Sequence, residues 1–105
     1  MLSPIAPDAL QQRLASGGML LIDIREPDEH AREHIPGAVL IPLSGLEAAD
    51  VKLEAGRTAV FHCKSGMRTE LNCERLAARV DGDALILEGG LEAWKQAGLP
   101  VATGI

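Results

Sequence analysis

Aromatic and basic residues are scarce in this sequence of 105 residues. It contains one Phe, one Trp and no Tyr, so few side chains are available to stack on nucleic acid bases. Ten Lys and Arg residues stand against fifteen Asp and Glu residues, which gives a net charge of −5 at pH 7. A nucleic-acid-binding surface normally has the opposite sign. The composition therefore argues against nucleic acid as a partner.

Long hydrophobic runs and multiple cysteines are also missing. No apolar run approaches the roughly 18 residues that a membrane-spanning helix requires, so we expect no membrane span in this chain. Residues 1–9 have neither a basic start nor a long apolar stretch, so we expect no signal peptide. Cys63 and Cys73 are the only cysteines, too few for a disulfide framework. These features favour a reducing compartment and a cytoplasmic protein.

Short apolar segments alternate with helical patterns along the chain. With 47% hydrophobic and 24% charged residues, the composition is that of one globular domain, which we place at residues 1–105. Apolar residues run almost without interruption in four segments, as in strands that are buried on both faces, and a weaker fifth strand is expected at residues 2–5. The four segments are residues 20–24, 38–41, 58–62 and 84–87.

Helices are expected between these strands. Pro7 begins one helical pattern that Gly17 ends, residues 69–80 form a second, and residues 91–97 form a third. Strands that alternate with helices predict right-handed crossovers and a parallel sheet with helices on both faces. The predicted fold class is therefore α/β.

The most informative segment begins where the strand at 58–62 ends. Ligands of such folds bind beyond the carboxyl ends of the strands, which is where Cys63 stands. The loop that follows leads into a helix, and Gly66 gives it the freedom to curl its N–H groups into an anion-binding nest. Lys64 and Arg68 add positive charge. This environment favours the thiolate, so Cys63 is predicted to be a nucleophile; the alternative is an ordinary buried cysteine.

Four segments in order resemble the motifs of rhodanese-like domains. Together they extend from Leu21 to Pro100, nearly the whole chain. The resemblance implies a single three-layer α/β/α domain with a central, mostly parallel sheet of five strands. The matching segments are LIDIRE at residues 21–26, HIPGA at 34–38, CKSGMR at 63–68, and EGGLEAW at 88–94 followed by GLP at 98–100.

The resemblance also implies an activity, that of a thiosulfate:cyanide type of sulfurtransferase. Cys63 would take a sulfane sulfur from thiosulfate or from a persulfide donor and hold it as a persulfide. The sulfur would then pass to cyanide or to a thiol, carried by a small molecule or by a protein. Such chemistry requires no metal and no organic cofactor. The residues expected to bind the persulfide and the anionic donor are Lys64, Ser65, Gly66, Met67 and Arg68.

Three further residues are expected to support this loop. Asp23 and Arg25 end a strand near the site, and either they shape the pocket or they form salt bridges that fix the loop and a turn expected at residues 26–28. Thr69 begins the helix after the loop. Glu70, in the first turn of that helix, is suitably placed to pair with Arg68 or Lys64.

Other polar residues favour structural roles. Cys73 falls in the apolar stripe of the helix, as a core thiol or, alternatively, as a redox partner of Cys63. His62 should face away from Cys63, because neighbouring side chains of a strand point to opposite faces. His34 is expected to order the turn before Pro36. The spacing of His62, Cys63 and Cys73 contains no C-x-x-C pair, so no metal site is predicted.

Two alternatives to sulfur transfer remain open at this point. One is a non-catalytic binding, sensing or regulatory module, although Cys63 and both loop cations argue against an inert loop. The other is a thiolate-based phosphatase or arsenate reductase. Four residues separate Cys63 from Arg68, whereas the corresponding motif of protein tyrosine phosphatases, C-x5-R, has five. The shorter loop suits a sulfur atom better than a tetrahedral phosphate.

Overall fold

The centre of the fold is a parallel sheet of five strands. In the computed structural model, which describes residues 2–49, 51, 53 and 56–104, the strand order is β1-β5-β4-β2-β3 and every pair is parallel. The predicted α/β fold class is thus confirmed. Both ends of the predicted domain, Met1 and Ile105, lie outside the described residues. The strands are β1 (Leu2–Ile5), β2 (Met19–Asp23), β3 (Val39–Leu40), β4 (Thr58–His62) and β5 (Ala84–Leu87).

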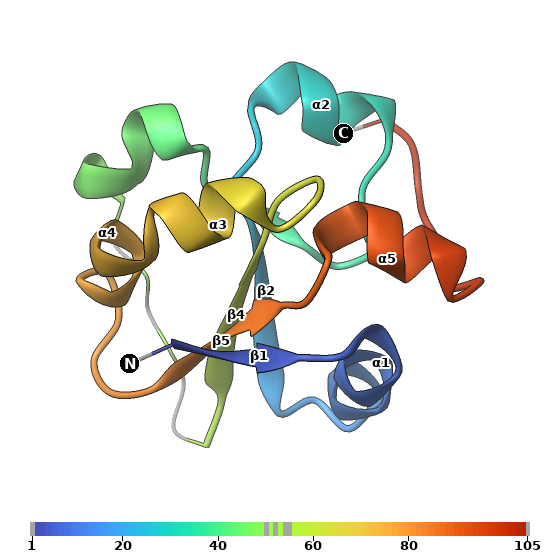
Figure 1. The fold of residues 1–105 in the computed structure, drawn as a ribbon, viewed down its shortest axis with the longest axis horizontal. Coiled ribbons are helices and arrows are strands. Elements are labelled where there is room, and N and C mark those ends of the chain that lie inside the picture. Colours follow the sequence, from blue (N-terminus) through green and yellow to red (C-terminus); the bar gives the residue numbers. More distant parts are fainter. Residues whose placement is uncertain (1, 50, 52, 54–55, 105) are drawn as a thin grey trace.

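Helices cover both faces of this sheet. Figure 1 shows α1 and α5 on one side and α3 and α4 on the other, with α2 beyond the end of the sheet where the loop after β4 also lies. The arrangement gives the three layers that an α/β fold requires. The helices are α1 (Pro7–Ala15), α2 (Pro27–Arg32), the 3-10 helix η1 (Leu43–Ala48), α3 (Met67–Leu71), α4 (Cys73–Ala77) and α5 (Gly90–Gln96).

Alternate residues of the central strands enter two separate cores. Leu21 and Val60 pack with Trp94 in the core beneath α1 and α5. Their neighbours Ile22 and Phe61 pack in the other core, against α4 and η1. A strand that is buried on both faces has a continuous run of apolar residues. For this reason the sequence pattern located β2, β4 and β5 to within one residue at each end.

Local structure differs from the expectations at three places. Residues 26–28 were expected to form a turn, but Pro27 begins α2, and Glu26 and Glu29 form a reciprocal capping box at its start. The expected helix at 69–80 is two short helices, because Asn72 adopts φ −116° and ψ 21° between them. The strand expected at 38–41 is only two residues long and is followed by η1. Within the described residues, no helix has the length and apolar character needed to cross a membrane.

Candidate active site

Cys63 follows directly on the carboxyl end of β4. Its side chain is fully buried, and the backbone N–H of Gly66 donates to its Sγ at 3.1 Å. On the β2 side, Ile24 donates its N–H to the carbonyl of His62, which joins the ends of the two strands. The loop therefore folds back over the sulfur, and a backbone donor points at it.

Gly66 and Thr69 hold the loop in this curled form. Gly66 has φ +95°, a left-handed conformation that costs glycine little and other residues more. The Thr69 Oγ1 hydroxyl donates to the Gly66 carbonyl at 2.8 Å. The same Oγ1 lies 3.9 Å from Cys63 Sγ. Thr69 thus closes the loop and forms one side of the space around the sulfur.

The start of α5 supports the loop from its other side. Leu91 and Glu92 donate their N–H groups to the carbonyls of Cys63 and Lys64, each at 2.9 Å. Gly90 stands at the closest approach, with φ +62°, and a Cβ there would lie 2.7 Å from both of those carbonyl oxygens. Only glycine allows α5 to approach the loop this closely, which explains why glycine stands at position 90.

Arg68 is held by a residue of α2. Its two terminal nitrogens donate to the two carboxylate oxygens of Glu29, at 2.8 and 2.9 Å. The hydrogen bond from Arg68 is the largest influence on Glu29 and lowers its pKa to about 2, against the opposing effect of burial. The same bond raises the pKa of Arg68. Glu29, and not Glu70, is therefore the residue that tethers Arg68.

Asp23 and Arg25 form a buried pair beneath α2. Arg25 donates to both carboxylate oxygens of Asp23 and, at 2.7 Å, to the carbonyl of Glu33. His30 Nδ1 lies 2.9 Å from the same carboxylate. Burial acts to raise the pKa of Asp23, but the hydrogen bonds from Arg25, with smaller contributions from His62 and His30, lower it to about 2. This pair ties α2 to the end of β2.

His62 does not contact the sulfur. Its Nδ1 lies 3.1 Å from the Cys63 carbonyl, and its Nε2 lies 3.9 Å from the carboxylate of Asp23. Burial lowers the pKa of His62, because it disfavours the charged ring. These contacts are those of a structural histidine. His34 likewise orders its segment, with Nδ1 2.8 Å from the His30 carbonyl and its ring stacked on that of His30.

Two cavities flank the loop. One, of about 330 Å³, lies between α2 and α5 and is reached by Lys64. The other, of about 550 Å³, is bordered by Ser65, Gly66 and Met67, by the edge strand β1 and by its neighbour β5. Lys64, Ser65 and Met67 are exposed. The predicted binding residues thus form a ridge between two spaces, with the sulfur buried beneath it.

Comparison with known proteins identifies the family. Residues 6–97, most of the chain, match the rhodanese-like domain. The chain belongs to the rhodanese-like family. It is 36% identical over 102 residues to a protein of Allochromatium vinosum named sulfurtransferase, and the match covers 96% of this chain and 95% of that protein. It is 44% identical over 97 residues to an uncharacterized protein of Synechocystis sp., slr1261, of which it spans 54% while 91% of this chain is covered.

A solved rhodanese structure has the same fold. A thiosulfate sulfurtransferase from Pseudomonas aeruginosa superposes with a TM-score of 0.83 at 30% identity, over 97% of this chain and 19% of that one. The three-layer architecture with its central parallel sheet is therefore that of a rhodanese-like domain. The sulfurtransferase among these relatives supports sulfur transfer as the class of chemistry.

Cys73 lies on α4 of this rhodanese-like domain, one helical turn beyond Thr69. Its Sγ is 3.3 Å from the Thr69 carbonyl, and its half-buried side chain borders the larger cavity. Neither cysteine is in a disulfide. Across the part of the chain that the structure describes, no group of three His, Cys, Asp or Glu side chains is arranged to hold a metal ion.

Two residues of the site could not be found by sequence reasoning. Glu29 lies 39 positions before Arg68, and nothing in the local pattern pairs them. His30 was left without a role, although it completes the contacts of Asp23. The only available signal concerned α2 and not the pair: Pro27 followed by the acidic Asp28 and Glu29 is typical of the first turn of a helix.

Proposed function

We propose that this rhodanese-like domain is a sulfurtransferase of the thiosulfate:cyanide type and that Cys63 carries the sulfur as a persulfide. The observation that supports this most directly is the Gly66 N–H, which donates to Cys63 Sγ at 3.1 Å. Backbone donors aimed at a buried sulfur stabilise negative charge on it. They favour both the attacking thiolate and the persulfide that follows.

In the first step, the Cys63 thiolate attacks the outer sulfur of thiosulfate. A bond forms between Sγ and that sulfur, while the bond from the outer sulfur to the sulfonate sulfur breaks and sulfite leaves with the electron pair. Three negative charges enter, and three leave as sulfite and a persulfide anion. A persulfide donor reacts in the same way, with a thiolate as the leaving group.

In the second step, the acceptor removes the outer sulfur. Cyanide or a thiolate attacks it, the bond to Sγ breaks, and Cys63 returns as a thiolate. The products are thiocyanate or a new persulfide. The sulfur atom itself is the transferred group, so these steps use no metal or organic cofactor.

The charged loop residues bind the anionic donor in this proposal. Lys64 is exposed and directly follows the nucleophile, so its ammonium group is free to attract thiosulfate. Arg68 contributes a charge partly offset by Glu29. The N–H groups from Lys64 to Arg68 hold the persulfide, and Thr69 keeps the loop closed. Asp23 and Arg25 do not contact the donor in this proposal; their ion pair holds α2 in place beside the loop.

A small anionic sulfur donor and a thiol acceptor are the proposed partners, and a protein thiol is one form the acceptor takes. We also propose a cytoplasmic location. The proposed mechanism requires Cys63 as a free thiolate, and a reducing compartment keeps thiols in that form.

The direct test is thiocyanate formation from thiosulfate and cyanide, measured for the wild type, Cys63→Ser and Cys73→Ser. We expect turnover by the wild type and Cys73→Ser and none above background by Cys63→Ser. A wild type without turnover toward thiosulfate and persulfide donors alike would contradict the proposal and favour a non-catalytic binding module.

A further inference from the structure

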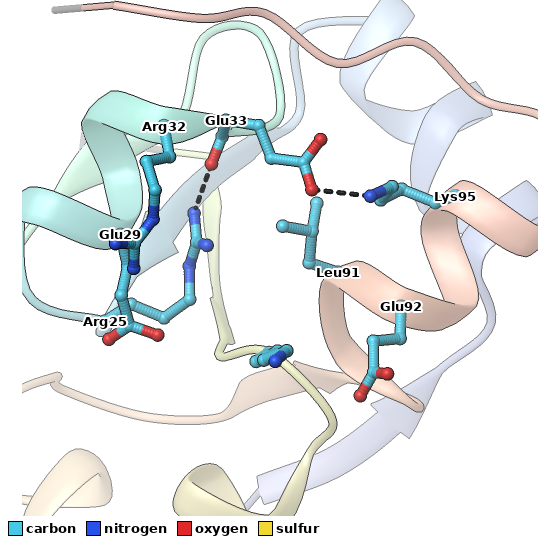
Figure 2. Close-up of a pocket in the computed structure, with 8 residues that line it drawn as sticks. Arg25, Glu29, Arg32, Glu33, Leu91, Glu92 and Lys95 are labelled. Carbon is cyan, nitrogen blue, oxygen red and sulfur yellow. Dashed lines mark hydrogen bonds and ion pairs between the residues drawn. The ribbon is translucent and has the colours of Figure 1, made fainter.

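The cavity between α2 and α5, here called the α2–α5 cavity, is lined by charges of both signs. Its volume is about 330 Å³, within the range of sites for small molecules. Figure 2 shows Glu33 reaching across from the end of α2 to Lys95 on α5, with Leu91 between the two walls. The lining residues used below are Glu29, Lys64, Leu91, Glu92 and Lys95.

This cavity lies over both ends of the active-site loop. Lys64, next to Cys63, reaches it from one end of the loop. Glu29, which also lines it, holds Arg68 at the other end of the loop. A molecule in the α2–α5 cavity therefore lies beside Lys64 at one end of the loop around Cys63 and beside Glu29, the partner of Arg68, at the other end.

Most of the charges around the cavity already have partners. Arg25 is paired with Asp23, and Lys95 is paired with Glu33. Glu29 is paired with Arg68. Arg32 is paired with Asp28. Among the charged lining residues, all of which the structure describes, Lys64 and Glu92 are those whose side chains have neither a hydrogen bond nor an ion pair. The cavity thus offers one uncommitted cation and one uncommitted anion.

The backbones that carry these two charges are fixed relative to each other. The N–H of Glu92 donates to the Lys64 carbonyl at 2.9 Å, and Gly90 allows that approach. The two side chains form no ion pair with each other in the structure. In Figure 2 the Glu92 carboxylate points away from Lys95, toward the loop that follows β4. A ligand with separated charges of both signs fits this arrangement.

We propose that the α2–α5 cavity binds the sulfur acceptor and that this acceptor is a small zwitterionic thiol, one that carries both a carboxylate and an ammonium group. Its carboxylate pairs with Lys64, its ammonium group pairs with Glu92, and its carbon chain lies on Leu91. This inference rests on the proposed sulfur transfer. Thiosulfate has no ammonium group, so Glu92 distinguishes the acceptor from the donor.

Transfer of the sulfur to this acceptor requires no oxidant, reductant or other reactant. The acceptor thiol loses its proton to water and attacks the outer sulfur of the Cys63 persulfide. The bond between that sulfur and Sγ breaks, Cys63 leaves as a thiolate, and the acceptor becomes a persulfide. The oxidation state of the transferred sulfur passes unchanged from one carrier to the other.

A series of four thiols tests this proposal. The probes are L-cysteine with both charges, cysteamine with only the ammonium group, 3-mercaptopropionate with only the carboxylate, and uncharged 2-mercaptoethanol. Each is compared at equal thiolate concentration, because thiol acidity itself alters the rate. We expect kcat/KM to be highest for L-cysteine, by about fivefold over each singly charged probe, the effect of one partly exposed ion pair.

The matched variants are Glu92→Gln in the cavity and Glu74→Gln on the exposed face of α4. Glu92→Gln should lower kcat/KM about fivefold for L-cysteine and cysteamine, and it should not lower it for 3-mercaptopropionate, 2-mercaptoethanol or cyanide, which carry no ammonium group. Glu74→Gln should change none of these values. Retained cyanide transfer shows that the Glu92→Gln protein is folded and can be loaded with sulfur.

Two results would overturn the inference in different ways. Equal reactivity of all four thiols, with no selective effect of Glu92→Gln, would refute the zwitterion site and leave sulfur transfer intact. No transfer to cyanide or to any thiol by the wild type would refute the proposed function and the acceptor site together.

Discussion

The carboxylate of Glu29 accepts hydrogen bonds from both terminal nitrogens of Arg68, a residue 39 positions away in the chain, with N···O distances of 2.8 and 2.9 Å. The side chains are 20% and 34% exposed, so the pair lies at the edge of the site and water reaches it. Since the pKa of Glu29 is about 2, the carboxylate is charged at any pH suitable for an assay. The pair ties α2 to the active-site loop and reduces the positive charge that Arg68 presents.

Replacing Arg68 by Ala should raise the KM for thiosulfate about tenfold and lower kcat less. Removal of a charged donor typically costs about 1.4 kcal/mol, or tenfold in an equilibrium constant, and it also leaves the Glu29 charge unopposed beside the loop. Steady-state kinetics of thiocyanate formation measure both constants. An unchanged KM with a large loss of kcat would place Arg68 in the transition state instead.

Removing the Glu29 charge from the Arg68→Ala protein should restore part of the donor binding. In Arg68→Ala the unpaired carboxylate repels thiosulfate, and Glu29→Gln eliminates that repulsion with little change in shape. The KM of the double variant should therefore fall about threefold below that of Arg68→Ala, as expected for a partly exposed charge. A double variant with a higher KM than Arg68→Ala would mean that Glu29 serves only to hold α2 in place.

The carboxyl group of Asp23 should titrate near pH 2 in the folded protein. Its pKa is lowered from 3.8 to about 2, so its contribution to stability, about 2 kcal/mol, is complete above about pH 4 and is lost as the pH falls through 2. The ¹³C shift of the Asp23 carboxyl carbon, followed by NMR against pH, gives the midpoint directly. A midpoint near 4 would show that the pair with Arg25 does not stabilise the charged form.

Gly90→Ala should inactivate the protein, whereas Gly98→Ala should not. Both glycines have positive φ, +62° and +78°, but an added Cβ at Gly98 meets nothing within 4 Å. A left-handed alanine costs about 1 kcal/mol, and Gly98→Ala should lose roughly that in the free energy of unfolding. Gly90→Ala adds a contact of 2.7 Å with the Cys63 and Lys64 carbonyls, so the loop must shift.

Urea unfolding and thiocyanate formation on both variants measure this difference. Equal stability and equal activity of Gly90→Ala and Gly98→Ala would contradict the close approach of α5 to the loop.

Patterns local to the chain were enough to locate much of this fold. Continuous apolar runs identified β2, β4 and β5, because strands buried on both faces lack polar alternation. The position of Cys63 followed from the rule that sites lie at the carboxyl ends of such strands. The family motifs then supplied the order of the loop and the GG segment, for which the structure gives the steric reason at Gly90.

Pairings between distant segments could not be obtained in this way. The Glu29–Arg68 pair depends on α2, which was mistaken for a turn because six residues carry too little periodicity to identify a helix. The break at Asn72 was also missed; there the side-chain amide donates to the Arg68 carbonyl and accepts from Arg75, bonds that helical periodicity does not indicate. The uncommitted charges of Lys64 and Glu92 were visible only after the other charges had been assigned partners.

The central claim is that Cys63 carries the transferred sulfur, and the intact mass of the protein after treatment with thiosulfate tests it most directly. We predict a gain of one sulfur atom in the wild type and in Cys73→Ser, reversed by a reductant and absent in Cys63→Ser. A gain that persists in Cys63→Ser, or a wild type that gains no sulfur from thiosulfate or from a persulfide donor, would contradict the account.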